Sequence, residues 1–177
     1  DFPSIIFLQS GATLYASQRL KSLEEYKDKL TKLTNASCIF LNERAIKFRS
    51  FEEYYPWEEG YPPLAFSTLS IARLVAEGAI SIDCVMPGLK VASNQLLDRF
   101  ELQAANQQVA GLAALSWVHK ISPNLVSLSD IDGLIEKTLK LQSSEGWFQE
   151  YGGPDLGYLS VTIDCLWDAF DAVGDIR

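Results

Sequence analysis

Cysteine is scarce in this sequence of 177 residues, and its placement excludes two common kinds of site. The three cysteines, Cys38, Cys84 and Cys165, are far apart, each lies among apolar neighbours, and none belongs to a CxxC pair. An odd number of isolated thiols argues against a disulfide framework and against a zinc cluster. We therefore expect buried, reduced thiols and a reducing compartment, which favours the cytoplasm.

Histidine is scarcer still, because His119 is the single one in the chain. The sequence also lacks an HExxH helix, a phosphate-binding loop and a Gly-x-Ser-x-Gly elbow. These absences exclude the zinc-peptidase, P-loop nucleotide-binding and serine-hydrolase motifs. No motif for a metal or an organic cofactor remains, and we expect neither.

Basic residues are outnumbered: Lys and Arg total 15 against 23 Asp and Glu, so the net charge is −8. An acidic chain repels phosphate groups, so we expect no nucleic-acid partner and no docking on an anionic membrane surface. No apolar run reaches the length of a membrane span. The nearest approach to a basic patch, Arg44, Lys47 and Arg49, is interpreted as the solvated face of a strand.

What the sequence has in abundance is helical periodicity. Apolar residues recur at steps of three or four over residues 14–33, 64–77, 92–120, 128–142 and 156–173, and each range is predicted to be a helix. Residues 37–51 predict a short β-hairpin that turns at Asn42–Glu43. Residues 52–63, rich in proline and aromatic side chains, predict a loop, and residues 80–91, with a Pro-Gly pair, predict a connection.

The predicted helices alternate in character. Those over 64–77 and 128–142 have one apolar face, whereas the second half of 92–120 and the helix over 156–173 are apolar on most sides. Half-buried outer helices paired with enclosed inner helices predict an all-α fold in which antiparallel helical hairpins form two layers. We expect residues 1–177 to form a single helical domain.

One loop gathers side chains that suit ligand binding. Aromatic and acidic residues surround a Gly-Gly-Pro bend between two predicted helices, namely Glu145, Trp147, Phe148, Glu150, Tyr151, Asp155 and Tyr158. A loop of this kind on a rigid scaffold is a common way to build a binding surface. Pairs of carboxyl groups hydrolyse glycosidic bonds, and we expect the aromatic rings to stack on sugars. The simpler interpretation is that the acids are solvated and the rings pack beneath the loop.

The order of these elements resembles the repeat unit of (α/α) toroids. An outer helix, a loop with Glu-Gly-Trp-Phe and Gly-Gly-Pro-Asp, and an inner helix opening at Tyr158 make up the resemblance, over residues 64–177. Such proteins include heparinase- and alginate-lyase-like polysaccharide lyases, glycoside-processing enzymes, terpenoid cyclases and protein prenyltransferases. The pair Asn106–Gln107 before Val-Ala-Gly-Leu-Ala-Ala-Leu is similar to lyase inner helices in which an asparagine faces the cleft. The resemblance implies a partial toroid, either part of a larger chain or a homo-oligomer.

The resemblance also implies acid–base chemistry on a glycosidic bond, by elimination or by hydrolysis, on an oligosaccharide or small-molecule ligand. Asn106 would neutralise a uronate carboxylate, and Tyr158 or Tyr151 would return a proton. His119 lies ~20 Å further along the helix from Asn106 and is expected to cap its helix instead. The candidate catalytic residues are Asn106, Glu150, Tyr151 and Tyr158, and the candidate substrate-binding residues are Trp57, Glu58, Tyr61, Gln107, Trp147 and Asp155.

Two other functions stay open. The same loops would form the interface of a non-enzymatic helical module that binds a ligand or a protein, and the absence of a well-placed histidine favours this alternative. A terpenoid-cyclase-like domain would need an aspartate-rich acid motif, which the sequence lacks. A prenyltransferase-like zinc site is not expected, because Asp164 and Cys165 are adjacent on a helix and point about 100° apart. With Asp168 and Asp171, Asp164 is interpreted as part of a solvated helix face.

Overall fold

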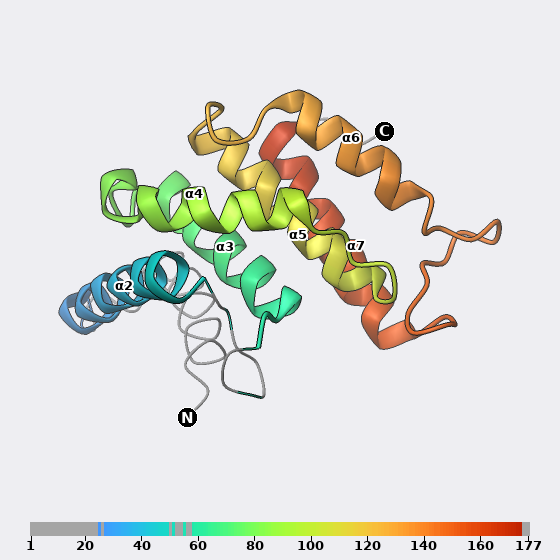
Figure 1. Ribbon diagram of the computed structural model, residues 1–177, viewed down its shortest axis with the longest axis horizontal. Helices are drawn as coiled ribbons and strands as arrows, with labels where there is room; N and C mark the ends of the chain where they lie inside the picture. The colour runs from blue at the N-terminus through green and yellow to red at the C-terminus, as the bar shows by residue number, and fades with distance from the viewer. Residues whose placement is uncertain (1–24, 26, 50, 52–54, 56–57, 175–177) are drawn as a thin grey trace.

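The computed structural model describes residues 25, 27–49, 51, 55 and 58–174. This part of the chain is all-α, as predicted, and contains no strand. Its elements in order are α2 (Lys27–Asn42), the π-helical turn η2 (Glu43–Phe48), α3 (Tyr61–Ala76), α4 (Ile82–Asp98), α5 (Ala105–Ile121), α6 (Leu128–Leu139) and α7 (Leu156–Val173) (Figure 1). Most of the helix predicted over residues 14–33, and Trp57 in the predicted loop, lie outside the described residues.

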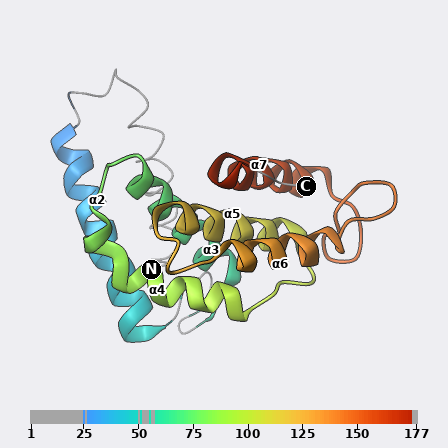
Figure 2. The same ribbon diagram turned by 90° about the horizontal axis from the view of Figure 1, so that it is seen from above.

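Helix α5 is the centre of the fold, because it packs along both α3 and α7 (Figure 2). Helices α4 and α6 contact it more locally. Every residue from Ala105 to Val118 except Gln107 is buried, as the apolar sequence predicted. Glycine allows the closest approach of α3 to this helix, since a side chain at Gly111 would collide with the hydroxyl group of Tyr61.

The β-hairpin predicted over residues 37–51 is wrong. Helix α2 continues to Asn42, and η2 extends the helical segment to Phe48. Asn42 has right-handed helical angles (φ −62°, ψ −44°), and the chain leaves the helix at Arg49, where φ is 50°. Arg44 and Lys47 therefore lie on this helical turn, and Arg49 at its end, rather than on a strand face.

Contact with α4 helps to explain why this segment is helical. The Asn42 carboxamide inserts into the backbone of α4: its Nδ2 donates to the Cys84 carbonyl at 2.5 Å, and its Oδ1 accepts from the Gly88 N–H at 2.9 Å. In an uninterrupted α-helix these two backbone groups would bond to each other. Pro87 lies between them and disturbs the helix, because it has no N–H and its ring needs space. The amide of Asn42 thus restores both hydrogen bonds.

Helix α4 changes the predicted boundaries on both sides. The range 80–91 is mostly helical rather than a connection, and α4 begins after Ser81, whose hydroxyl accepts from the Asp83 N–H at 3.4 Å. The single helix predicted over 92–120 is two helices, α4 and α5, separated by the non-helical residues 99–104. This separation matters for the site described below.

Capping residues set the starts of the last two helices. The Ser127 hydroxyl accepts from the Asp130 N–H at 3.2 Å, and the Asp130 carboxylate accepts from the Ser127 N–H at 2.9 Å. This reciprocal pair is a capping box, and it starts α6. Asp155 caps α7 through one hydrogen bond, which its side chain accepts from the Tyr158 N–H, and α7 ends at Gly174 with φ 76°.

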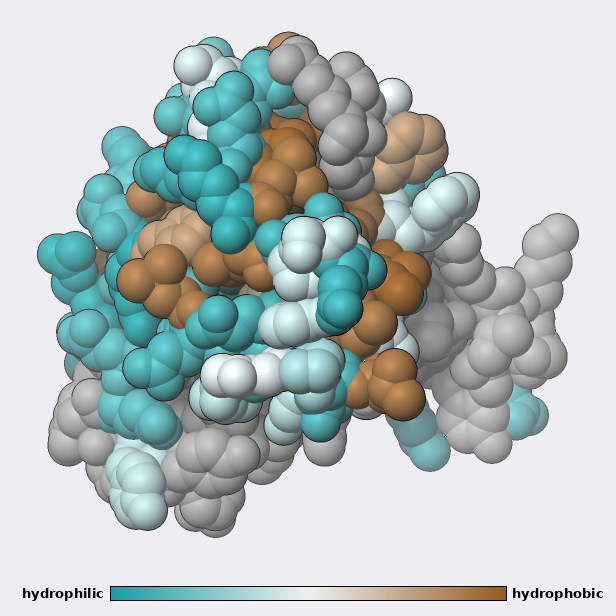
Figure 3. Space-filling model, turned by 90° about the vertical axis from the view of Figure 1, so that its right-hand side faces the viewer, coloured by the Kyte–Doolittle hydropathy of each residue, from teal (hydrophilic) through white to brown (hydrophobic). Residues whose placement is uncertain are grey.

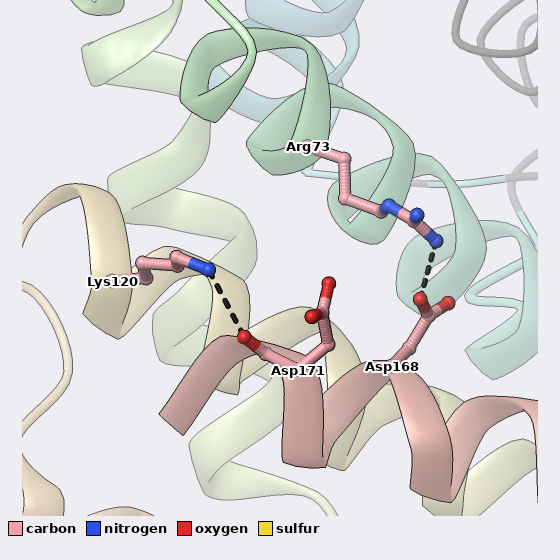
Figure 4. Close-up of polar contacts among 4 residues, drawn as sticks. All are labelled: Arg73, Lys120, Asp168 and Asp171. Atoms are coloured by element: carbon pink, nitrogen blue, oxygen red, sulfur yellow. Dashed lines mark hydrogen bonds and ion pairs between the residues drawn. The ribbon is translucent and has the colours of Figure 1, made fainter. Parts of the chain in front are cut away.

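A cluster of charged side chains from α3, α5 and α7 joins these three helices (Figure 4), and the ring of Trp117 on α5 packs against it. Arg73 of α3 forms a salt bridge with Asp168 of α7, and its guanidinium carbon lies 5.2 Å from the ring centroid of Trp117. Lys120 lies 4.3 Å from the same centroid and donates to the Asp171 carbonyl at 3.0 Å. Asp168 is buried, so the expectation that it faces solvent is wrong, because α3 supplies its counter-ion.

Two of the three thiols are buried as predicted. Burial raises the pKa of Cys38 to about 11 and that of Cys165 to about 12, so both stay protonated at neutral pH. Cys84 is exposed, which corrects the prediction for that residue.

Helix α7 is less enclosed than predicted for an inner helix. Cys165 and Ala169 are buried on one side, whereas Leu156, Ile163 and Trp167 on another side are exposed. One face of this apolar helix is therefore in solvent.

Candidate functional site

The loop between α6 and α7 lies against the first turn of α5. Ala104, which precedes this helix, has no side-chain acceptor for the N–H groups of the first turn. The loop supplies acceptors instead: the Gln149 carbonyl accepts from the Ala105 N–H at 3.0 Å, and the Glu150 carboxylate accepts from the Asn106 N–H at 2.7 Å. Two segments far apart in the sequence thus meet at the amino end of α5.

Glu150 caps α5 from a distant part of the chain. Its carboxyl group is buried, and Oε2 has no hydrogen-bond partner among the described residues. Burial raises the pKa of Glu150, the hydrogen bond from Asn106 opposes this rise, and the carboxylates of Asp155 and Glu101 add to it. The geometry indicates that Glu150 holds the loop on α5, whatever further role it has.

Tyr151 follows directly and points its hydroxyl group at α5. Its φ of 48° lies in the left-handed region, which is uncommon outside glycine, and its N–H donates to the Gln103 carbonyl at 2.6 Å. Gln107 Nε2 donates to the Tyr151 hydroxyl oxygen at 2.9 Å. Burial, then Tyr158 and the nearby carboxylates, raise the pKa of Tyr151 although Gln107 lowers it. The hydroxyl group is therefore protonated at neutral pH.

Tyr158 lies beside Tyr151 in the first turn of α7. The two ring centroids are 6.4 Å apart and the planes meet at 63°, an edge-to-face arrangement. Asp155 Oδ1 accepts from the Tyr158 N–H at 2.9 Å, so Asp155 fixes the start of the helix that carries this ring. We call the exposed surface formed by Gln107, Tyr151 and Tyr158 the tyrosine surface.

Trp147 and Phe148 shape the other side of the loop. Trp147 is half-buried, and its Nε1 donates to Glu145 Oε2 at 3.0 Å. Its carbonyl accepts from the Ser143 N–H at 2.8 Å, which closes the turn, and Phe148 is buried. Trp147 therefore borders the loop without a ring contact to either tyrosine of the tyrosine surface. Figure 3 shows the side of the molecule at which this loop lies.

Three predicted substrate-binding residues do not join the tyrosine surface. The Tyr61 ring is buried, and its hydroxyl group donates to Gln108 Oε1 at 3.2 Å, so it belongs to the core. Glu58 is half-buried and accepts from the Tyr55 N–H at 3.2 Å. Trp57 lies outside the described residues. The loop predicted to be a second half of the site therefore contributes no described group to it.

The connection between α4 and α5 supplies residues that the sequence analysis missed. Gln103 holds the Tyr151 backbone, and Glu101 accepts from the Gln103 N–H at 2.7 Å. The Glu101 N–H in turn donates to Gln108 Oε1 at 2.8 Å. These residues were hidden because the range 92–120 was predicted to be one continuous helix. Glu101, Leu102 and Gln103 are all good helix formers, so the local sequence contains no signal of the break.

Neither a metal site nor a membrane span is found in the described part of the chain. No group of three or more His, Cys, Asp and Glu side chains there could hold a metal ion. Among the same residues, no helix combines the length and hydrophobicity needed to cross a membrane. His119, predicted to cap its helix, places Nδ1 2.8 Å from the Val126 carbonyl in the connection to α6.

Comparisons with protein-family models, with curated proteins and with solved structures found no match for this chain. The function is therefore inferred from the geometry of the site.

Two substitutions of Glu150 separate its capping role from its charge. Glu150→Ala removes the acceptor for the Asn106 N–H, and we expect it to lower the free energy of unfolding by about 1–2 kcal/mol. Glu150→Gln keeps an acceptor oxygen and removes a buried charge, so we expect a change of less than ~1 kcal/mol at pH 7. Urea unfolding measures both, and equal losses in the two variants would contradict the capping role.

The pH dependence of these variants follows from the raised pKa of Glu150. Because the folded protein binds this proton more tightly than the unfolded chain, the wild type gains stability as the pH falls through the folded pKa. The gain is complete below the unfolded pKa of ~4.3. The Gln variant lacks it, so the wild type should gain on that variant as the solution becomes acidic.

Proposed function

We propose that this chain is a carbohydrate-active domain that binds an oligosaccharide on the tyrosine surface and protonates a glycosidic oxygen with Tyr151. The observation that carries the proposal is the hydrogen bond from Gln107 Nε2 to the Tyr151 hydroxyl oxygen, at 2.9 Å. Gln107 donates in this bond, so the phenolic proton of Tyr151 is directed to another acceptor. Tyr151 is 63% exposed, which leaves that proton accessible to a ligand.

A proton donor is needed in both reactions that the loop chemistry favours. Elimination and hydrolysis each leave a glycosidic oxygen that must gain a proton as its bond breaks. The phenol of Tyr151 is protonated at neutral pH, so it has a proton to give. Tyr158, 45% exposed and set at 63° to Tyr151, offers a second ring on which a sugar packs.

The charges around the tyrosine surface bear on the class of oligosaccharide. The carboxylates of Asp155 and Glu101 lie close enough to Glu150 to raise its pKa, and this gathering of acids disfavours an anionic ligand. Against this, Nδ2 of Asn106 donates to no described residue and lies at the positive amino end of α5, which suits a uronate carboxylate. Neutral and uronate-containing oligosaccharides are therefore both included in the test.

The test is an NMR titration of the purified chain with a panel of neutral and uronate-containing oligosaccharides. We expect one class to shift the ring signals of Tyr151 and Tyr158. Gln107→Leu should weaken that binding about five-fold, because one hydrogen bond that orients Tyr151 is lost. Gln95→Leu is the matched control. The Gln95 side chain on α4 donates to the Arg49 carbonyl, away from the tyrosine surface, so this substitution should leave the affinity for the oligosaccharide unchanged.

Two results would overturn the proposal. One is the absence of any shift at Tyr151 and Tyr158 with every member of the panel. The other is binding that Gln107→Leu and Gln95→Leu weaken equally, since the ligand would then not depend on the tyrosine surface.

A further inference from the structure

Helix α7 carries a stripe of exposed apolar side chains that the proposed function does not use. The stripe consists of Leu156, Ile163, Trp167 and Phe170, of which Leu156 is 87%, Ile163 59% and Trp167 68% exposed. At 100° per residue the four side chains lie within about 60° of arc, so they form one line along the helix. The line extends over about 21 Å, which is close to four helical turns.

The stripe is separate from the tyrosine surface. Tyr158 projects from α7 about 160° away from the line of the stripe, toward Tyr151. Within the stripe, the Trp167 and Phe170 rings pack on each other with centroids 5.6 Å apart. Large apolar side chains gathered on one exposed line are typical of a protein-interaction surface, because single exposed residues would be scattered.

The charges beside the stripe are acidic. Asp164 and Asp171 are exposed and lie about 60–80° from Leu156 on one flank. Helix α7 contains no lysine or arginine. Of the basic groups that contact α7, Arg73 is engaged by Asp168, and Lys120 donates to the Asp171 carbonyl near the end of the helix. This flank therefore favours positive charge on whatever covers the stripe.

We propose that the stripe on α7 binds an amphipathic helix of a partner protein, with apolar residues along its contact line and lysine or arginine on the flank facing Asp164 and Asp171. A helix laid along α7 would bury Ile163 and Trp167 at the centre and pair its basic residues with the aspartates at the edge.

A second copy of this chain fits the flank less well. Two-fold symmetric, antiparallel packing of α7 on its copy brings equivalent flanks together. Asp164 and Asp171 would then face the same residues of the copy, and like charges at an interface are unfavourable. Charge complementarity therefore selects a basic partner helix over self-association.

The test uses the purified chain and two synthetic helical peptides of 18 residues, which share a leucine stripe and differ in having lysine or glutamate on the flanks. Calorimetry should show that the lysine peptide binds at least ten-fold more tightly than the glutamate peptide. Trp167→Gln should weaken binding of the lysine peptide by about ten-fold or more. The double variant Asp164→Asn, Asp171→Asn should weaken binding of the lysine peptide about three-fold. This loss of affinity should be smaller at high salt, because salt screens the charges.

Matched controls lie on α6. Leu128→Gln removes an exposed apolar side chain from α6, as Trp167→Gln does from α7, and the pair Asp132→Asn, Glu136→Gln removes two exposed acids; after circular dichroism confirms folding, neither should change affinity. Equal binding of the two peptides would overturn the proposal, as would equal losses in the α6 and α7 variants. A dimer seen by sedimentation that Trp167→Gln abolishes would also overturn it, by assigning the stripe to a second copy.

Discussion

Replacement of Arg73 by methionine is expected to lower the free energy of unfolding by about 3 kcal/mol. The substitution leaves Asp168 buried without its counter-ion, and a buried charge without a partner is costly. We place the effect at the lower end of the usual range because both side chains keep some contact with solvent. Methionine retains a flexible apolar stem over the Trp117 ring, so the loss reports mainly on charge. Equilibrium unfolding in urea measures the change.

The pH dependence of this variant provides an internal check. Burial raises the pKa of Asp168 while Arg73 lowers it, so removing Arg73 raises the pKa further. The penalty is fully present above the folded pKa, shrinks as the pH falls, and disappears below the unfolded pKa of ~3.9. The variant should therefore approach wild-type stability in acid. A loss that is independent of pH would show that packing, rather than charge, is responsible.

Two further variants control for this prediction. Asp171→Asn removes an exposed charge from the same helix, and we expect a change within about 0.5 kcal/mol. The double variant Arg73→Met, Asp168→Leu replaces the salt bridge by apolar groups and should recover most of the lost stability. If it is as unstable as Arg73→Met alone, the explanation by an unpaired charge is wrong.

Under the proposed function, replacement of Tyr151 by phenylalanine is expected to lower kcat on an oligosaccharide substrate by about 100-fold or more. The change removes the phenolic proton and keeps the ring that faces Tyr158. The variant also loses the hydrogen bond from Gln107, so KM should rise by about five-fold, as in Gln107→Leu, which is far less than the fall in kcat. Steady-state kinetics separate the two effects, because a group that acts only in the transition state alters kcat alone.

The pH profile and a matched variant test the same assignment. Because burial raises the pKa of Tyr151, activity that depends on its protonated hydroxyl group should persist to a higher pH than the ordinary pKa of a tyrosine would allow. Tyr55→Phe, an exposed tyrosine elsewhere in the chain, should leave kcat unchanged. A Tyr151→Phe variant with wild-type kcat would remove the proton-donor role and leave binding as the function of the surface.

The candidate site was predictable where one loop contains its residues. Glu150, Tyr151, Asp155 and Tyr158 lie within nine positions, so their proximity follows from the chain itself. The meeting of Glu150 with Asn106 joins residues 44 positions apart and depended on a resemblance rather than on a local pattern. The buried state of Glu150 was not predicted, because burial is set by what packs over a side chain.

The core position of Tyr61 shows the same limit. Its sequence neighbours are prolines, acids and aromatic residues typical of a surface loop, and they predicted a binding role. The ring is buried because Gly111 of α5 leaves space for it and Gln108 accepts a hydrogen bond from its hydroxyl group. Both residues are about fifty positions away in the chain. No property of the Tyr61 segment alone reveals that pocket.

The sequence by itself determined the all-α class, the burial of α5, and the starts of α6 and α7. These features depend on periodicity and capping, which involve residues no more than about four positions apart. Tertiary structure decided the rest. Asn42 bridges the backbone groups on either side of Pro87 in α4, Arg73 neutralises an aspartate 95 positions away, and α7 keeps one apolar face in solvent. Such contacts form only after distant segments pack together, so a local pattern is compatible with several outcomes and the packing selects one.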